Sequence, residues 1–198
     1  SSYTTSPMMS ALHFVNELTQ KKLIQKVDHI RVNLHGSLST IGKVRMTDKA
    51  VLLGLSGMRP ETVDLDEIDS FVESIKKTGK VRLGGRHYIE LRPQEDIVYI
   101  KEKINGKSAV VFEAFDSLHS KKIHSHSYYS LHGGAVTDGA NYNFPPILKG
   151  EAPFPYSNAE ELLAQCSKNH LTISTIVMNN ESAIQHKSID NIIEDLDL

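Results

Sequence analysis

The sequence of 198 residues contains one cysteine and no tryptophan. The single thiol, Cys166, excludes a framework of internal disulfide bonds and fits a reducing compartment, so we expect a cytoplasmic protein. It also excludes an iron–sulfur cluster held by this chain alone, because such clusters usually need three or four cysteine thiolates. Cys166 stands among leucines within a helical pattern, and we interpret it as a small residue of the hydrophobic core.

A strong excess of charge of one sign and a long apolar run are also absent. The formal net charge is −2, which argues against a general role at nucleic acids or membrane surfaces, because binding to phosphates needs a clear cationic excess. No apolar stretch approaches the roughly 20 residues that a transmembrane helix needs. We therefore expect neither nucleic acid nor a membrane as a partner. No signal peptide is visible. The sequence starts at Ser1 without a Met, so we expect it to be a processed or trimmed piece.

The apolar pattern predicts an α+β fold. Residues 29–35 alternate between apolar and polar side chains, which predicts a half-buried strand. Further strands are expected at residues 81–83, 88–91, 97–100, 109–115 and 122–130, with a hairpin turn at Asn105-Gly106 and a strand end at Gly133-Gly134. Helices are expected at residues 7–22, 49–55, from about 64 to 78, 159–168 and 172–185. This order indicates a mixed, largely antiparallel sheet with helices packed on it.

Local signals also place helix ends and a domain boundary. Thr47 or Asp48 is expected to cap the helix at residues 49–55, and Asn158 with Glu161 forms a capping box before the next long helix. Residues 141–158, which are rich in proline, are expected to form a loop. We assign residues 1–185 to one domain. The acidic tail 186–198 is interpreted as a C-terminal helix on its own domain, a partner-docking helix, or a linker to a further domain.

The segment of residues 36–48, which we call the 36–48 segment, has the composition of a small anion site. Backbone N–H groups at its two glycines, hydroxyls at Ser37, Ser39 and Thr40, and the start of the following helix can converge on a carboxylate. Arg45 offers a planar fork for such a group. The alternative is a solvated loop whose cations face water. A nucleotide P-loop is excluded, because five residues separate the glycines where four are needed, and Val44 replaces the metal-binding hydroxyl.

Two further groups of residues carry possible chemistry. The hydroxyls of residues 1–6 precede Pro7 and either hold an anion at the helix start or simply cap the helix. His124 and His126 share one face of a predicted strand, with His132 nearby, but no tight zinc motif is present. We interpret these histidines as ordinary side chains without a metal. No Gly-x-Ser-x-Gly nucleophile elbow occurs either.

Several stretches taken together resemble the N-terminal β domain of iron–sulfur L-serine dehydratases, also called L-serine deaminases. In order along the chain they are SSYTTSPM (1–8), HGSLSTIGKVRMTDKA (35–50), GMRPETVDLD (57–66), YYSLHGGAV (128–136), PFPYSNAEELLAQC (153–166) and LTISTIVMNNE (171–181). The resemblance covers nearly the whole chain. It implies the fold of the allosteric substrate-binding domain of some phosphoglycerate dehydrogenases.

The resemblance also implies a lyase of amino-acid metabolism and gluconeogenesis that converts L-serine to pyruvate and ammonia. A catalytic α domain, in cis or as a separate subunit, is expected to carry a 4Fe–4S cluster, while this chain holds no cofactor and no metal. A homodimer and a small amino acid or carboxylate ligand are further expectations. The family pattern assigns catalytic positions to Arg45 and Thr47 and substrate-binding positions to Ser1, Ser2, Thr4, Ser37, Lys43 and Asp48.

The sequence departs from the family pattern at the residues that would move protons. The family's loop histidine, a candidate base, is Arg45 here, and the preceding glycine is Val44. In the first motif the family's histidine is Tyr3 and its glycine is Ser6. An arginine stays protonated and cannot accept the α-proton, although it can bind a carboxylate. The sequence therefore leaves two hypotheses, a dehydratase β domain or a catalytically degenerate relative that binds a carboxylate or partner subunit in a regulatory or scaffolding role.

Overall fold

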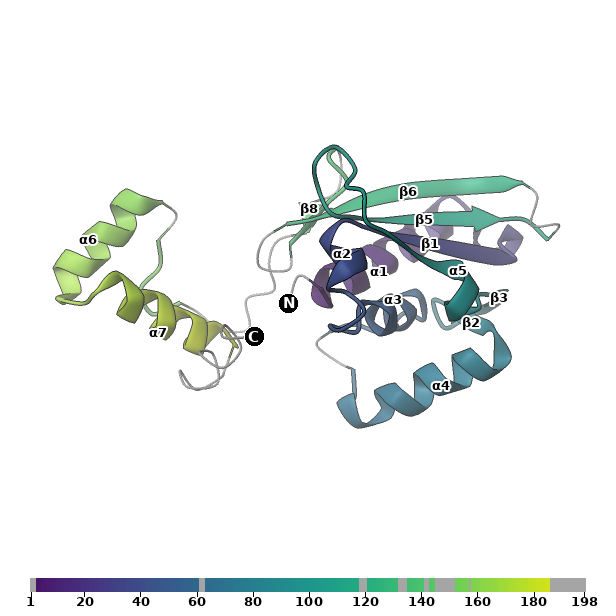
Figure 1. Ribbon diagram of the computed structural model, residues 1–198, viewed down its shortest axis with the longest axis horizontal. Coiled ribbons are helices and arrows are strands. Elements are labelled where there is room, and N and C mark those ends of the chain that lie inside the picture. The colour runs from purple at the N-terminus through teal and green to yellow at the C-terminus, as the bar shows by residue number, and fades with distance from the viewer. Residues whose placement is uncertain are drawn as a thin grey trace. The chain divides into compact units, whose positions relative to one another are not determined.

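The chain divides into two units, residues 1–146 and residues 147–198. The computed structural model describes residues 3–60, 63–117, 121–131, 135–140, 143–144, 152–156 and 158–185 (Figure 1). The predicted boundary after residue 185 borders the tail 186–198, which lies outside the described residues, and it stays a prediction. None of the described helices is both long and apolar enough to cross a bilayer.

The first unit contains the sheet and five α-helices among its described residues. The helices are α1 (Thr5–Gln20), α2 (Ser37–Thr40), α3 (Thr47–Leu55), α4 (Ile68–Thr78) and α5 (Pro93–Asp96), with 3-10 turns at Ile24–Lys26 and Leu65–Glu67. The strands are β1 (His29–His35), β2 (Lys80–Leu83), β3 (His87–Glu90), β4 (Ile97–Ile100), β5 (Ala109–Phe115), β6 (Lys122–Ser130), β7 (Val136–Thr137) and β8 (Asn143–Phe144). The second unit contains α6 (Ala159–Asn169) and α7 (Ile173–Gln185).

The sheet is mixed and mostly antiparallel, which confirms the predicted fold class. Its strand order is β2-β3-β1-β5-β6-β7-β8, and β4 also pairs with β1. β1 runs antiparallel to β5 along its whole length, and it runs parallel to β3 at its start and to β4 over its second half. All other pairings are antiparallel. The central position of β1 brings its C-terminal end next to the start of β5 and the end of β4.

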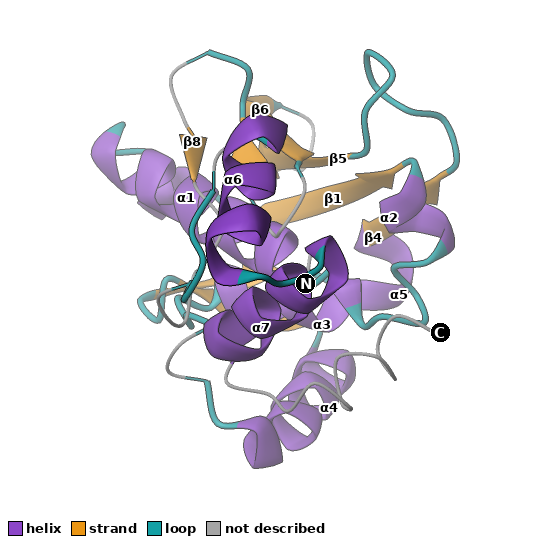
Figure 2. Ribbon diagram, turned by 90° about the vertical axis from the view of Figure 1, so that its left-hand side faces the viewer, coloured by secondary structure: helices purple, strands orange, loops and turns teal. Residues whose placement is uncertain are grey.

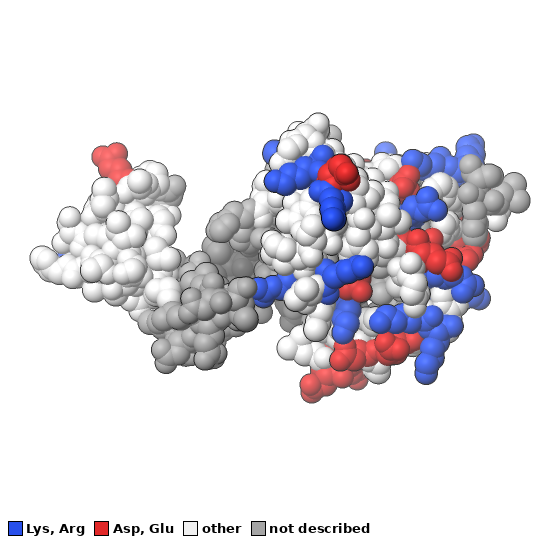
Figure 3. Space-filling view, in the orientation of Figure 1, with Lys and Arg blue, Asp and Glu red and all other residues white. Residues whose placement is uncertain are grey.

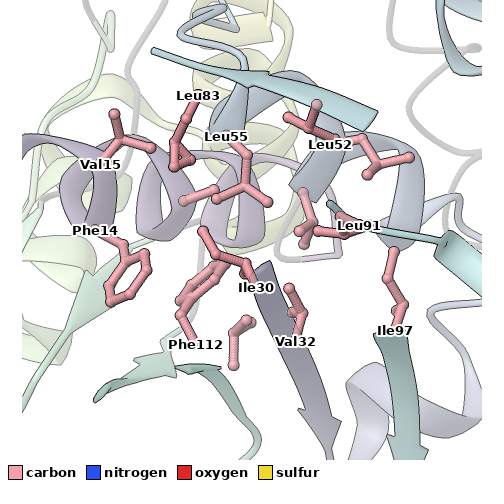
Figure 4. Close-up of a cluster of buried hydrophobic side chains, with 14 of the residues drawn as sticks. Phe14, Val15, Ile30, Val32, Leu52, Leu55, Leu83, Leu91, Ile97 and Phe112 are labelled. Atoms are coloured by element: carbon pink, nitrogen blue, oxygen red, sulfur yellow. The ribbon is translucent and has the colours of Figure 1, made fainter. Parts of the chain in front are cut away.

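Helices cover one face of this sheet. The alternation that predicts β1 also decides which face is covered, since Ile30, Val32 and Leu34 are fully buried while their neighbours are not. Figures 1 and 2 show α1 and α3 beneath the strands and α4 in an outer position. The close-up in Figure 4 shows how α1 and α3 side chains meet those of the strands. Phe14 of α1 stacks on Phe112 of β5, with their ring centres 5.0 Å apart.

Local sequence signals were correct at several turns and helix ends. Asn105 and Gly106 both adopt positive φ, 49° and 72°, as a type I′ hairpin turn requires. The Asn158 side chain accepts a hydrogen bond from the Glu161 N–H at 2.9 Å and caps α6 as predicted. Gly133-Gly134 lies outside the described residues.

Other local expectations were wrong because tertiary contacts override them. α3 begins at Thr47, and its N-cap is Met46 in a left-handed conformation, so neither Thr47 nor Asp48 caps it. Residues 37–40 form a helical turn inside the predicted loop, and β8 lies inside the proline-rich stretch. Cys166 is half-buried rather than a core residue.

The close approach of α1 and α3 depends on a glycine in the middle of α3. A Cβ added to Gly54 would lie 2.3 Å from the Met8 carbonyl oxygen and 2.8 Å from the Ala11 Cβ. A mid-helix glycine costs about 1 kcal/mol relative to alanine, so only this packing justifies its presence.

We predict that Gly54→Ala lowers the stability of the first unit despite its better helix propensity. The added methyl meets backbone rather than a flexible side chain, and overpacking of this kind typically costs about 1–3 kcal/mol. Urea unfolding followed by circular dichroism measures the change. Ser74→Ala on the exposed face of α4 is the control and should leave stability unchanged within about 0.5 kcal/mol. A Gly54→Ala protein as stable as this control would contradict the packing argument.

Three polar side chains tie three strands together on the face of the sheet opposite α1. Glu113 of β5 accepts a hydrogen bond from the Asn33 side-chain amide at 2.8 Å and pairs with Lys122 of β6. Burial raises the pKa of Glu113, but the hydrogen bonds from Lys122 and Asn33 and the charges of Lys122 and Arg31 outweigh it, so the net pKa lies below its usual 4.5. The folded state therefore favours the charged carboxylate.

We predict that the stabilising effect of the Glu113 carboxylate is present above pH 4.5 and is lost as the pH falls through its lowered pKa. At pH 7, Glu113→Gln should cost roughly 0.5–1 kcal/mol of unfolding free energy, because one partner is half-exposed. The difference between the two proteins should shrink steadily below pH 4.5 in urea unfolding experiments. A difference that stays constant from pH 7 to pH 3 would contradict this prediction.

Candidate functional site

The 36–48 segment begins with a turn that is fixed from two sides. Gly36 has a φ of +68°, and its N–H donates to the Ile100 carbonyl at 3.0 Å. The next residue, Ser37, donates its backbone N–H to the Ser108 hydroxyl at 3.0 Å, and the two hydroxyl oxygens lie 2.8 Å apart. The start of the segment is therefore held between the end of β4 and the start of β5, and the Ser37 hydroxyl already has a partner within the protein.

The second glycine of the segment is required by packing. A Cβ on Gly42 would lie 1.9 Å from the Leu38 carbonyl oxygen and 2.8 Å from the Thr47 hydroxyl oxygen. The Gly42 carbonyl accepts the Thr47 N–H at 2.9 Å, which closes the segment onto the start of α3. Residues 43–46 thus project from a tightly packed base.

Two predicted binding residues meet at a tyrosine that sequence reasoning missed. The Lys43 ammonium lies over the Tyr99 ring of β4, 4.7 Å from its centre. Burial, and then the negative charge of Asp48, raises the pKa of Tyr99 to about 12. Tyr99 is therefore a neutral phenol at physiological pH. The only signal in the sequence is its place on β4, which gives no hint of contact with the segment.

The tip of the segment exposes its cation among apolar side chains. Arg45 is exposed, and among the described residues its guanidinium has no hydrogen-bond or ion-pair partner. Its apolar neighbours are also exposed, with Ile41 at 42%, Val44 at 78% and Met46 at 54%. Met46 also holds a left-handed φ of 61°, which is uncommon for a residue other than glycine. The tip presents a charge that can bind an anion, next to apolar surface that a partner can cover.

The N-terminal segment meets the 36–48 segment at the start of α3. The Thr47 hydroxyl donates to the Tyr3 carbonyl oxygen at 2.5 Å, and Thr47 is fully buried. Thr4 follows directly and is half-buried, with its carbonyl accepting the Met8 N–H at 3.0 Å. Ser1 and Ser2 lie outside the described residues. The structure therefore brings together the two regions that the sequence singled out, although the role of each predicted site residue stays a prediction.

The donor set of this chain does not fit an iron–sulfur cluster. The sequence has one thiol, and it lies on α6 in the second unit. A cluster bound by cysteine needs three or four thiolates within a few ångströms of one another. Any such cluster must therefore draw its ligands from outside this chain.

Comparison with known proteins gives the family. A family profile described as "Serine dehydratase beta chain" matches residues 1–141. The chain is 34% identical to an L-serine dehydratase of Streptomyces coelicolor, over 92% of this chain and 41% of that protein. It is 32% identical to the L-serine dehydratase TdcG of Escherichia coli, over 95% of this chain and 41% of that protein. It is 30% identical to an L-serine dehydratase of Haemophilus influenzae, over 94% of this chain and 41% of that protein.

The chain therefore belongs to the serine dehydratase beta chain family. It spans about two fifths of the length of these relatives. The family and the relatives' names agree with the resemblance to L-serine dehydratases drawn from the sequence. They do not by themselves assign a role to any residue of the 36–48 segment.

We predict that Thr47→Val destabilises the first unit by about 1–3 kcal/mol, because it keeps the shape of the side chain but leaves the partly buried Tyr3 carbonyl without its donor. Thr40→Val is the matched control, since the exposed Thr40 hydroxyl makes only a long 3.4 Å contact with the Ser37 carbonyl. Thermal unfolding of the two variants measures the difference. Equal effects of the two substitutions would show that the Thr47 hydroxyl does not anchor the N-terminal segment.

Proposed function

We propose that this chain is the β domain of an L-serine dehydratase and that its 36–48 segment contributes the carboxylate-binding part of a substrate site. An α domain, in cis or as a separate subunit, completes that site and supplies the 4Fe–4S cluster. The overall reaction converts L-serine to pyruvate and ammonia. A homodimer of the complete protein is part of the same proposal.

The arrangement of the segment supports this proposal. Its base is anchored by contacts with Ser108 and Tyr3, while Arg45 is exposed and Lys43 lies over the Tyr99 ring. Functional residues commonly lie on loops held by a rigid scaffold. A guanidinium binds a carboxylate through two parallel hydrogen bonds, and the neighbouring exposed apolar side chains fit coverage by a second domain.

The roles of the individual residues follow from their chemistry. Arg45 binds the carboxylate of the amino acid. Lys43, held over Tyr99, adds positive charge beside it, and Asp48 offers an acceptor for the substrate's ammonium group. Thr47 positions the N-terminal segment rather than touching the substrate, because its hydroxyl is buried and occupied.

A specific observation favours a second candidate function. The residue at the family's candidate base position is an exposed arginine, which cannot take a proton at physiological pH. A relative that has kept carboxylate binding but lost proton abstraction would serve as a regulatory or scaffolding domain. The two functions share the binding step and differ in turnover.

The test uses the full-length natural protein, or this chain with its separate catalytic subunit, prepared without oxygen. If the first function is correct, pyruvate forms from L-serine, and Arg45→Lys raises the KM at least tenfold with a smaller change in kcat. A tenfold or larger rise in KM corresponds to the loss of one charge-assisted hydrogen bond, which contributes about 1.5–3 kcal/mol of binding free energy. Arg82→Lys on β2, whose guanidinium lies over the Tyr88 ring, is the matched control and should leave KM unchanged.

The second function predicts a different set of results. The unmodified protein then binds a small carboxylate such as L-serine in calorimetry without forming pyruvate, and Arg45→Lys weakens that binding. Arg45→His restores measurable pyruvate formation if the lost proton acceptor is the reason for inactivity. The carboxylate-binding role of Arg45, which both functions share, is wrong if Arg45→Lys changes neither KM nor carboxylate binding.

A further inference from the structure

A second group of ionisable side chains lies away from the 36–48 segment, between α1 and β6. His124, His126 and Tyr128 alternate along β6 and share the face that α1 crosses. Glu17, from the last turns of α1, reaches both histidines. The proposed dehydratase chemistry uses none of these residues.

The three side chains converge on one point. Glu17 Oε2 lies 3.1 Å from His124 Nε2 and 2.5 Å from His126 Nδ1. One nitrogen or oxygen from each residue lies within 4.8 Å of the others, which is the spacing of a three-ligand metal site. Each side chain is about four-fifths buried, with 18%, 20% and 18% exposure for His124, His126 and Glu17. The site is thus largely shielded from solvent.

One nitrogen of the group is left without a hydrogen bond. His124 Nε2 is buried and, within the described residues, has no hydrogen-bond partner. This nitrogen lies 3.1 Å from Glu17 Oε2, which is close enough for a hydrogen bond, but the angle between the two groups does not allow one. A buried polar atom without a partner is costly, and a bound cation between the two atoms removes that cost.

The surroundings fix the orientation of both imidazoles. The second nitrogen of His126, Nε2, lies 3.1 Å from Asp138 Oδ2, so a carboxylate holds the ring while Nδ1 points at Glu17. Metal-binding histidines usually have such a carboxylate or carbonyl partner. Stacked aromatic rings fix the planes of both imidazoles. Tyr128 stacks on His126 with ring centres 4.5 Å apart, and Phe14 stacks on His124 with ring centres 5.7 Å apart.

The donor set selects the kind of ion. Two imidazole nitrogens and one carboxylate oxygen suit Zn²⁺ and neighbouring divalent transition metals, whereas Mg²⁺ and Ca²⁺ prefer oxygen ligands. Bonds of about 2.0–2.2 Å in tetrahedral geometry separate ligand atoms by about 3.3–3.6 Å. The Glu17 carboxylate must therefore withdraw by up to about 1 Å, which its rotatable side chain permits.

We propose that Glu17, His124 and His126 bind one divalent transition-metal ion of the Zn²⁺ type, with Asp138 orienting His126. The ion joins α1 to the first half of β6, whereas the pairing of β6 with β7 involves its last two residues. With three ligands from these residues, a fourth position remains for water or another ligand. The site stabilises the fold independently of any carboxylate at the 36–48 segment.

The test is a titration of the full chain, stripped of metal with a chelator, with Zn²⁺ and with Co²⁺. We expect one ion per chain, a Kd in the micromolar range or tighter, and d–d absorption bands of tetrahedral Co²⁺. At a hundredfold excess over Kd, Zn²⁺ should raise Tm by about 5–10 °C. Long-range ¹H–¹⁵N correlation spectra should place the metal on Nε2 of His124 and Nδ1 of His126.

Matched variants separate this site from chance binding to a histidine-rich surface. His126→Gln and Glu17→Gln should each weaken binding at least a hundredfold. His35→Gln on β1 and Glu73→Gln on α4, which lie outside the group, should leave Kd unchanged. Circular dichroism of the metal-free variants reports whether they fold.

Two results would overturn the proposal. The first is no stoichiometric binding of either ion by the folded protein. The second is binding that the control substitutions weaken as much as the site substitutions do. In either case the three side chains form only a hydrogen-bonded ion pair network. If His126→Gln fails to fold, the metal-bound nitrogens in the spectra of the unmodified protein decide the matter.

Discussion

The packing of α1 against α3 and the sheet is the contact on which the rest of the first unit depends. Gly54 lets the two helix backbones approach, and α1 then lays Phe14 and its neighbours on the strands. A helix rises about 1.5 Å per residue, so Thr5 and Glu17 lie roughly 18 Å apart along one rigid element. One end of α1 meets the 36–48 segment, and the other end meets β6. Both candidate sites therefore inherit their geometry from the same helix.

The 36–48 segment combines a fixed base with a projecting tip. Its base is built from close backbone contacts that leave no room for a side chain at Gly42, while Arg45 at its tip is exposed to solvent. Figure 3 shows basic and acidic side chains mixed over the visible face of this unit, so this face does not carry a broad field of one sign. If the segment binds a carboxylate as proposed, the specificity of that binding depends on local geometry rather than on the net charge of this face. The guanidinium of Arg45 is a charged hydrogen-bond donor and cannot accept a proton at physiological pH.

The histidine group on β6 follows a different chemistry from the cluster that the family resemblance implies. Thiolates hold iron–sulfur clusters, whereas imidazoles and a carboxylate suit a single divalent ion. The two kinds of centre therefore use different types of ligand. A metal at Glu17, His124 and His126 therefore adds a property that membership of the family does not supply.

The sequence by itself determined the elements whose signals are local. The alternation in residues 29–35, the Asn105-Gly106 turn and the Asn158 cap each depend on neighbours within a few positions, and the structure confirms them. The family motifs likewise located the 36–48 segment. Only the tertiary structure decided that Thr47 anchors Tyr3 instead of capping α3, that Tyr99 lies under Lys43, and that Glu17 meets a histidine 109 positions away. Such contacts join distant segments through the packing of whole helices on a sheet, and no periodicity along the chain records them.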